Sequence, residues 1–271
     1  MRPGSDGAVL LDGRGTVVVG GAGRMSFLQN LVTNDLRLLD TQAAIYAALL
    51  TAQGKFLHDF FIVEQGETLV LECEGGARAE DLARRLSTYR LRATVEITVR
   101  PSVTVWALPS EADFPADLKD SALVYPDPRH AGMGRRALMA QDLIPLSTPG
   151  DFDFYDRRRI ALCLPDGSRD ILPEQDTVIE AGLDRCHGVS FTKGCYVGQE
   201  LTARLHHRGL AKKRLRAIRT ALDFPPWGAD IRLKDGRLAG TMRSSCGDAG
   251  LAMLRDDLTD ALWAEGIFIP V

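Results

Sequence analysis

The sequence predicts an α+β protein with a small β-barrel at its C-terminal end. In the first half, short strand-like and helical stretches alternate irregularly, so hairpins are expected rather than a regular βαβ repeat. After Lys212, short strand-like stretches are separated by Pro225-Pro226, Asp235-Gly236 and Gly247-Asp248, which is typical of a small barrel. The chain has 271 residues, of which 45% are apolar, so it can form one large domain or two to three small ones.

Strands in the first half are predicted where turn residues separate apolar stretches. Residues 8–11 and 16–19 flank a glycine-rich turn and are predicted to form one hairpin. Residues 43–50 and 56–63 flank Gln53-Gly54-Lys55 and are predicted to form strands around that turn. Further predicted elements are helices at 25–32 and around Leu82, Leu86 and Tyr89, and strands at 68–73, 93–99 and 102–108.

The second half begins with an irregular stretch, followed by helices and the barrel. Residues 109–135 are rich in proline and aspartate, which predicts a loop that could mark a junction between two α/β subdomains. Residues 151–162 and 174–183 are predicted helices. We therefore expect a body over residues 1–210 and a barrel over residues 211–271.

Composition excludes several classes of protein. The net charge is −3, from 33 Lys and Arg against 36 Asp and Glu, so a globally basic, histone-like protein is excluded. Five cysteines without a CxxC pair argue against a disulfide framework and a four-cysteine zinc site. No stretch reaches the roughly 20 apolar residues that span a bilayer, and the N-terminal segment has no continuous signal-peptide core. These observations predict a cytoplasmic protein with no membrane partner, with an organelle protein whose transit peptide has been removed as the alternative.

Two apparent motifs do not match their templates. The glycine-rich stretch 20–23 follows strand-like residues, but it lacks the full dinucleotide fingerprint and no βαβ unit follows, so a turn and helix cap is favoured. Cys186, Cys195 and three nearby histidines have spacings that match no standard zinc finger or ribbon.

Cys195 is the best candidate for a functional thiol. Gly194 and Gly198 bracket it, so the backbone can turn tightly or approach a ligand closely. Lys193 is two residues away, and positive charge favours the thiolate, which is the form that binds iron or attacks an electrophile. A structural thiol remains an equal alternative from the residues alone. Cys73 and Cys163 are interpreted as packed small side chains, and the roles of Cys186 and Cys246 stay open.

A basic segment follows Cys195. Residues 203–219 contain seven Lys and Arg, two His and no acid. This pattern has three interpretations: a solvated strand edge, a nucleic-acid site, or a clamp for an anionic small molecule such as folate, whose carboxylates pair with Arg or Lys. The solvated edge is favoured over nucleic acid.

The segment around Cys195 also resembles a known family. Residues 193–200, Lys-Gly-Cys-Tyr-Val-Gly-Gln-Glu, match the signature of the YgfZ family, a branch of the GcvT-like folate-binding proteins. The wider segment 188–209 is similar to the mitochondrial iron–sulfur assembly branch. Residues 27–35, 53–59 and 240–255 resemble further segments of the family, so the resemblance spans most of the chain.

The resemblance implies a fold, a cofactor and a partner. It implies a GcvT-like α+β body around a folate-sized cavity and a C-terminal β-barrel. It also implies tetrahydrofolate binding, with a transient iron–sulfur cluster shared through Cys195 with an A-type iron–sulfur carrier protein. Nucleic acid and membranes are not expected as partners. The cofactor-binding candidates are Glu180, Lys193, Gln199, Arg204 and Arg208.

Two carboxylates of this sequence lie in segments that resemble functional segments of the glycine-cleavage T-protein. Glu180 lies in Glu-Ala-Gly-Leu, which resembles the T-protein segment whose glutamate holds the pterin; a helix-surface glutamate is the equal alternative. Asp59 is similar to one member of a paired Asp-Asp that includes the catalytic acid. Here the pair is His58-Asp59, so one acid is missing and aminomethyl transfer is in doubt.

Three functions are therefore carried forward. The first is a folate-binding factor that supports the assembly or repair of iron–sulfur proteins, with Cys195 as thiolate and little or no enzymatic activity. The second is a tetrahydrofolate-dependent aminomethyl or one-carbon transferase using Asp59. The third is an RNA-binding or tRNA-modification accessory protein, which rests only on residues 203–219.

Overall fold

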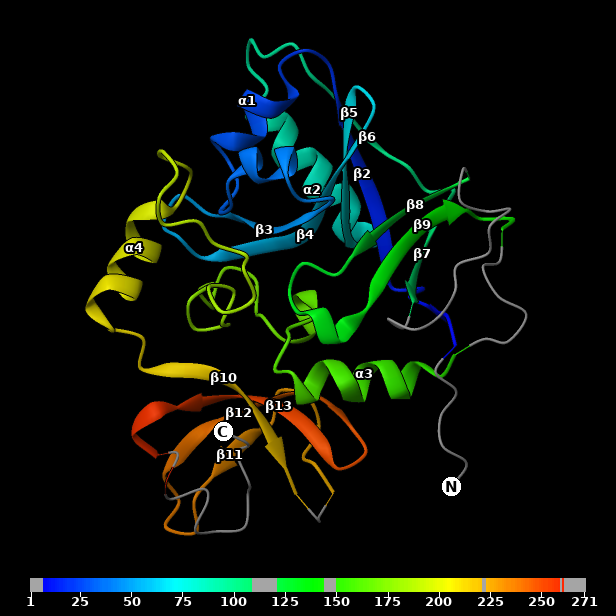
Figure 1. Cartoon of the computed structure of the whole chain (residues 1–271). Coiled ribbons are helices and arrows are strands. Elements are labelled where there is room, and N and C mark those ends of the chain that lie inside the picture. Colours follow the sequence, from blue (N-terminus) through cyan, green and yellow to red (C-terminus); the bar gives the residue numbers. More distant parts are fainter. Residues whose placement is uncertain (1–6, 109–120, 144–149, 221–222, 259, 261–271) are drawn as a thin grey trace.

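The chain forms three antiparallel sheets in the part that the computed structural model describes, which is residues 7–108, 121–143, 150–220, 223–258 and 260 (Figure 1). The middle sheet has the order β3-β4-β5-β2-β6 and contains β2 (Arg14–Gly20), β3 (Ile45–Leu50), β4 (Phe56–Gln65), β5 (Thr68–Glu74) and β6 (Glu96–Val99). The second sheet has the order β1-β7-β9-β8 and contains β1 (Val9–Leu10), β7 (Val103–Leu108), β8 (Ala122–Pro126) and β9 (Arg135–Ala140). The C-terminal sheet has the order β10-β13-β12-β11 and contains β10 (Lys213–Arg219), β11 (Asp230–Arg232), β12 (Leu238–Cys246) and β13 (Ala249–Arg255).

Both faces of the middle sheet are buried, which explains why its strands are almost continuously apolar. Side chains alternate between the faces of a strand. In β2, Val17 and Val19 belong to one core cluster and Val18 to the other; in β5, Leu69 and Val70 are divided in the same way. The predicted α+β class with antiparallel strands is confirmed.

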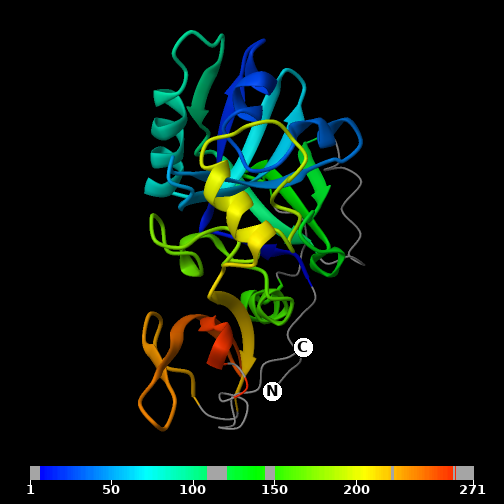
Figure 2. The same cartoon turned by 90° about the vertical axis from the view of Figure 1, so that its left-hand side faces the viewer.

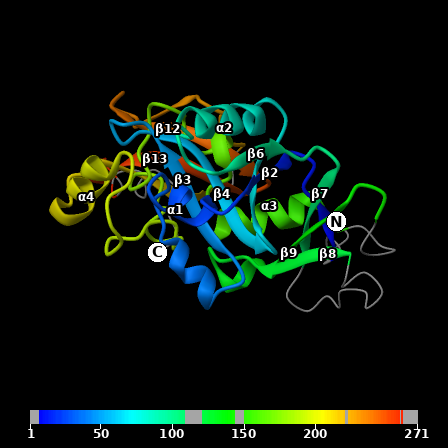
Figure 3. The same cartoon turned by 90° about the horizontal axis from the view of Figure 1, so that it is seen from above.

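Different elements cover the two faces of this sheet. Helices α1 (Arg24–Gln29) and α2 (Ala77–Thr88) pack on one face, where Leu82 and Leu86 of α2 are fully buried. The second sheet and the segment 171–196 pack on the other face. Seen from above, α2 and the strands β8 and β9 lie on opposite sides of β4 (Figure 3).

Helix α3 (Phe152–Ala161) joins the body to the C-terminal sheet. Its N-terminus is capped by the side chain of Asp151, which accepts a hydrogen bond from the backbone N–H of Asp153. Ile160 packs among residues of β10 and β13, and the helix lies between the body and the C-terminal sheet (Figure 2). Arg159, which is fully buried, pairs with Asp170 of the body and donates to Ser244 Oγ of β12 at 2.8 Å.

A buried carboxylate, Glu72 of β5, links the two sheets of the body. It accepts hydrogen bonds from Arg14 of β2 at 2.9 Å, from Arg136 of β9 at 2.7 Å and from the hydroxyl of Tyr125 in β8. Burial opposes ionisation of Glu72, but the guanidinium groups of Arg136 and Arg14 outweigh it and hold its pKa below the usual value. The carboxylate is therefore charged and fully paired inside the protein.

Two expectations in the first half are corrected. Residues 8–11 and 16–19 do not form a hairpin, because β1 pairs with β7 of the second sheet while β2 pairs with β5 and β6 of the middle sheet. The turn between them carries the chain from one sheet to the other. The predicted loop 109–135 lies partly outside the described residues, and its described part contains β8.

The predicted helix at 174–183 is also wrong. The segment 174–183 consists of turns, with mixed hydrogen bonds such as Ala181 N–H to Thr177 O at 3.0 Å and Leu183 N–H to Val178 O at 2.9 Å. Glu174 and Gly182 have positive φ angles of 62° and 78°, which a right-handed helix cannot contain. None of the described helices has the length and apolar character needed to cross a membrane.

We expect the stability of the protein to fall between pH 6.5 and 4 because of His58. This side chain is 2% exposed, and its Nε2 lies 2.8 Å from Asp81 Oδ2 of α2. Burial, reinforced by the positive charge of Arg78, lowers the pKa of His58 to about 4. Below pH 6.5 the unfolded chain therefore binds a proton that the folded protein excludes, and up to about 3 kcal/mol of unfolding free energy is lost by pH 4.

Urea unfolding of the wild type and of His58→Gln at several pH values measures this effect. The variant should show a flatter pH dependence over the same interval, since Gln cannot take up the proton. Identical slopes in the two proteins would contradict the assignment.

Candidate functional site

A cavity of about 880 Å³ opens beside the first residues of β3. Its wall includes residues from the segment 34–46, Pro126 at the end of β8, Pro128 after it, and residues from the segment 184–192. We call this space the loop cavity and residues 188–198, which contain the signature cysteine, the signature loop. The first residues of the signature loop, up to Thr192, therefore form part of the cavity wall. Cys195 follows three residues after Thr192.

The signature loop is fixed to the body by Thr33 and Asn34. The hydroxyl of Thr33 donates to Gly188 O at 2.7 Å, and Ser190 N–H donates to Thr33 O at 3.0 Å. The side-chain amide of Asn34 donates to His187 O at 2.7 Å. These polar groups are buried, so their hydrogen bonds hold the entry to the loop in one place.

Lys193 provides a second anchor for the loop. Its Nζ donates to three backbone carbonyls, those of Gln29 at 2.6 Å, Val32 at 2.8 Å and Asn34 at 2.7 Å. Lys193 is 5% exposed, and burial lowers the pKa of its ammonium group to about 8. An ammonium group has three N–H donors, so those of Lys193 are fully used within the chain.

The exit from the loop depends on close backbone contact between two glycines. Gly198, which precedes α4 (Gln199–Arg208), has a φ of +81°, and a Cβ there would lie 2.6 Å from Thr51 O and 3.0 Å from Gly54 Cα. Gly54 has a φ of +80°, and its Cβ would lie 2.7 Å from Leu201 Cβ. Both positions therefore exclude a side chain, and the turn between β3 and β4 sets where α4 begins.

Cys195 is exposed between two buried neighbours. Lys193 and Tyr196 are 5% and 7% exposed, and the Lys193 ammonium lies 5.2 Å from the centre of the Tyr196 ring. Gly194 faces open space. The arrangement therefore presents the thiol to solvent while the residues beside it hold its backbone.

The other cysteines are packed or partly covered. Burial raises the pKa of Cys73 and of Cys186 to about 12, and burial also raises the pKa of Cys163 and Cys246. Thiols with a raised pKa are poor thiolate donors at neutral pH.

An aromatic stack connects the signature loop to the last turn of α4. The ring of Phe191 lies parallel to His206, with 3.7 Å between centroids and 17° between planes, and edge-on to His207. His206 Nδ1 lies 3.8 Å from Asp184 Oδ2, so it extends this contact to the cavity wall.

Asp184 is a site residue that the sequence analysis missed. It lines the loop cavity, and its Oδ1 is buried without a hydrogen-bond partner among the described residues. A buried carboxylate oxygen without a partner is costly, so it marks a place where a ligand donor would be stabilised. The only signal in the sequence is its position directly after Glu-Ala-Gly-Leu.

The five predicted cofactor residues are not among the described residues that line the loop cavity. Glu180 Oε2 accepts instead from the N–H and the hydroxyl of Thr177, at 3.0 and 2.9 Å. Lys193 is bound to the three carbonyls, and Arg204 pairs with Glu200 on the exposed side of α4 at 2.6 Å. Gln199 begins α4 and Arg208 ends it. Lys193 and Arg204 are thus directed at other partners than a cofactor or Cys195.

Asp59 is buried rather than open to a substrate. Its Oδ2 accepts the hydroxyl hydrogen of Tyr46 at 2.7 Å, and the residue is 3% exposed. Burial raises its pKa, against the lowering effect of the nearby Arg14. The carboxyl group is thus held within the core by Tyr46, which itself lines the loop cavity.

Comparison with known proteins gives a family model for the C-terminal part of the chain and relatives that match most of it. Residues 212–268 match the family model described as the CAF17 C-terminal beta-barrel domain. The chain is 37% identical to the human "Iron-sulfur cluster assembly factor IBA57, mitochondrial", with 96% of this chain and 78% of the human protein covered. The chain belongs to the IBA57 family. The mouse member is 34% identical, with 91% of this chain and 77% of that protein covered.

Solved structures show the fold of this family member. The crystal structure of glycine cleavage system aminomethyltransferase T from Bartonella henselae matches with a TM-score of 0.75, covering 98% of this chain and 82% of that one. At 14% identity this likeness shows the fold alone. The predicted GcvT-like fold with a C-terminal barrel is confirmed.

The expected cytoplasmic location is wrong. It rested on the missing signal-peptide core and membrane span, which do not report on import into an organelle. The human and mouse relatives are named mitochondrial factors, and these names point to the mitochondrion instead.

Replacing Lys193 by Met should destabilise the protein. The change leaves three backbone carbonyls without their donor, and a loss of about 2–4 kcal/mol in unfolding free energy is expected from this number of unpaired groups. Urea unfolding gives the value, and hydrogen exchange should show faster opening of the signature loop.

Lys55→Met is the matched control. The Lys55 ammonium also donates to a backbone carbonyl, that of Gln175 at 2.7 Å, but this is one exposed bond and its loss should cost less than about 1 kcal/mol. Equal effects of the two substitutions would show that Lys193 is not a special anchor.

Proposed function

We propose that this protein is an iron–sulfur cluster assembly factor in which Cys195 supplies a thiolate ligand to a cluster held jointly with an A-type carrier protein. Membership of the IBA57 family supports the role in assembly. The observation that carries the assignment of the residue is the exposed Cys195 in a loop that Lys193 and Gly198 hold in place. Thiolate is the protein ligand that iron–sulfur clusters use most.

A second chain is required by the number of ligands. Iron–sulfur clusters are held by four protein ligands, most often cysteine thiolates. The described residues contain no group of three or more His, Cys, Asp or Glu placed to hold a metal ion, so Cys195 has no such set around it there. The remaining ligands would come from the carrier, and the cluster would be cargo shared between the two proteins.

We also propose that the loop cavity binds tetrahydrofolate. Its volume of about 880 Å³ lies within the 300–1,000 Å³ range of small-molecule sites. The free Oδ1 of Asp184 fits a pterin, because a carboxylate can accept from a ring N–H and an exocyclic amine. Bound folate would supply one-carbon chemistry, while Asp184 and the wall around it would bind and orient the ring.

The transferase alternative is not supported by the site. Asp59, the acid expected to act in transfer, is buried and already bonded to Tyr46. The RNA alternative is also weakened, because several cations of the segment 203–219 have acidic partners. These pairs are Arg204 with Glu200, Lys213 with Asp176, and Arg214 and Arg216 with Asp256.

The cysteine assignment is tested by anaerobic mixing with a cluster-loaded A-type carrier. Wild-type protein should form a complex that retains the cluster absorbance through size-exclusion chromatography, and Cys195→Ala should lose it. Cys246→Ala is the control, because its thiol is also partly exposed but lies at the end of β12. A Cys195→Ala protein that forms the same coloured complex as the wild type would refute the assignment.

The folate assignment is tested by anaerobic titration with tetrahydrofolate. Asp184→Asn should weaken binding by about tenfold or more, since a hydrogen bond to a charged group contributes about 1.5–3 kcal/mol. Glu180→Gln should leave the dissociation constant unchanged, because its side chain is bound to Thr177. The opposite order of effects would restore Glu180 as the pterin ligand, and absence of binding to the wild type would exclude folate.

A further inference from the structure

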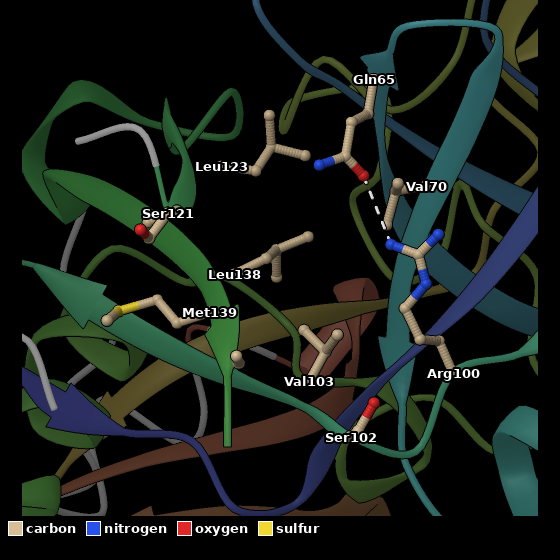
Figure 4. A pocket seen from close by; sticks show the side chains of 11 residues that line it. Gln65, Val70, Arg100, Ser102, Val103, Ser121, Leu123, Leu138 and Met139 are labelled. Carbon is tan, nitrogen blue, oxygen red and sulfur yellow. Dashed lines mark hydrogen bonds between the residues drawn. The ribbon is translucent and has the colours of Figure 1, made fainter. Parts of the chain in front are cut away.

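A second pocket, of about 280 Å³, lies between the middle and second sheets. It shares no lining residue with the loop cavity. Val70 of β5 forms one side, and Val103, Leu123 and Leu138 of β7, β8 and β9 form the other (Figure 4). We call this space the edge pocket.

One part of the edge pocket is apolar because it continues the core between the two sheets, whereas polar side chains such as Ser102 and Ser121 line the rest. Val70 and Leu138 belong to the same buried cluster, and Val103 and Leu123 pack against it while remaining partly exposed. The pocket is thus a place where apolar side chains of both sheets meet without filling the space between them. An apolar group that entered would be removed from water at little cost to the protein.

Arg100 supplies a positive charge at the rim. Its Nη1 donates to the neutral Gln65 Oε1 at 3.3 Å, and Figure 4 shows this pair beside the pocket. No acidic side chain is among the described lining residues, and within the described residues the hydrogen bond of the Arg100 side chain goes to the neutral Gln65. The guanidinium group therefore has donors directed to no anion within the described chain.

The backbone of Arg100 is held in place for this role. Its N–H donates to Thr16 O at 3.0 Å, and the hydroxyl of the buried Thr16 donates to Arg100 O at 3.1 Å. These bonds fix the crossing from β6 to β7 and do not depend on the arginine side chain. The backbone that carries the charge is thus in place before any ligand arrives.

We propose that the edge pocket binds a small monocarboxylate with an apolar tail. The carboxylate would pair with the Arg100 guanidinium, whose geometry matches two carboxylate oxygens, and the tail would lie between Val103, Leu123 and Leu138. A cation is disfavoured by the lack of acids in the described lining. A fully polar anion such as phosphate would pair with Arg100 but would leave the apolar part of the pocket without a partner.

Hexanoate is the probe, and hexanamide is its neutral counterpart. With the full chain labelled at Leu and Val methyl groups, hexanoate at millimolar concentration should shift the NMR signals of Leu123, Leu138 and Val103. Hexanamide should bind at least tenfold more weakly than hexanoate, because it lacks the charge that Arg100 recognises. Equal binding of the two compounds, or no shift with either, would overturn the proposal.

Variants of the rim complete the test. Arg100→Gln should weaken hexanoate binding at least tenfold, whereas Arg100→Lys should weaken it less, because it keeps the charge but loses the two-oxygen geometry. The methyl spectrum without ligand shows whether each variant is folded. Asp184→Asn, in the loop cavity, should bind hexanoate as the wild type does. Binding that is lost in Asp184→Asn but kept in Arg100→Gln would place the compound in the loop cavity and refute the edge pocket.

Discussion

The ammonium group of Lys193 is the constraint on which the candidate site depends. A short helix such as α1 ends with backbone carbonyls that its own N–H groups cannot reach. Lys193 reaches three carbonyls in and after this helix end, at Gln29, Val32 and Asn34. One side chain thereby closes the end of α1 and fixes the backbone two residues before the exposed thiol. The loop cavity depends on the same contact, because Asn34 lies in its wall.

The sequence shows which residues are buried more reliably than it shows which strands pair. The strands β3, β4 and β5 were predictable because turn residues separate them and each pairs with its neighbour in the chain. The chain crosses between sheets after Leu10, and an apolar pattern contains no information about that crossing. The segment 174–183 has helix-like apolar spacing, but the positive φ of Glu174 is a tertiary effect that no local propensity predicts.

At the candidate site, residue type was predictable and side-chain direction was not. Cys195 was a candidate because glycines bracket it and a lysine lies two residues away, and its side chain is exposed in the structure. Its role as a thiolate ligand stays a prediction. The direction of Lys193 depends on where α1 ends, far away in the sequence. In the same way, the turns at 177–184 direct Glu180 back to Thr177 and leave Asp184 in the cavity wall. A helix there would have given different directions, so the local structure decides which of the two carboxylates lies in the cavity wall.

The buried Glu72 cluster has a consequence for how cargo can move. The Glu72 carboxylate pairs with Arg14 of its own sheet and with Arg136 of the second sheet. Separating the two sheets would break the pair with Arg136 and leave buried charges unpaired, so hinge motion between the sheets carries a large electrostatic penalty. The two sheets of the body therefore keep a fixed orientation relative to each other, and the body acts as a rigid support for the signature loop. If Cys195 holds a cluster as proposed, the distance between its thiol and the metal centre would change through approach of the other protein or through side-chain rotation at Cys195. Access and release would then depend on the docking of two surfaces rather than on separation of the two body sheets.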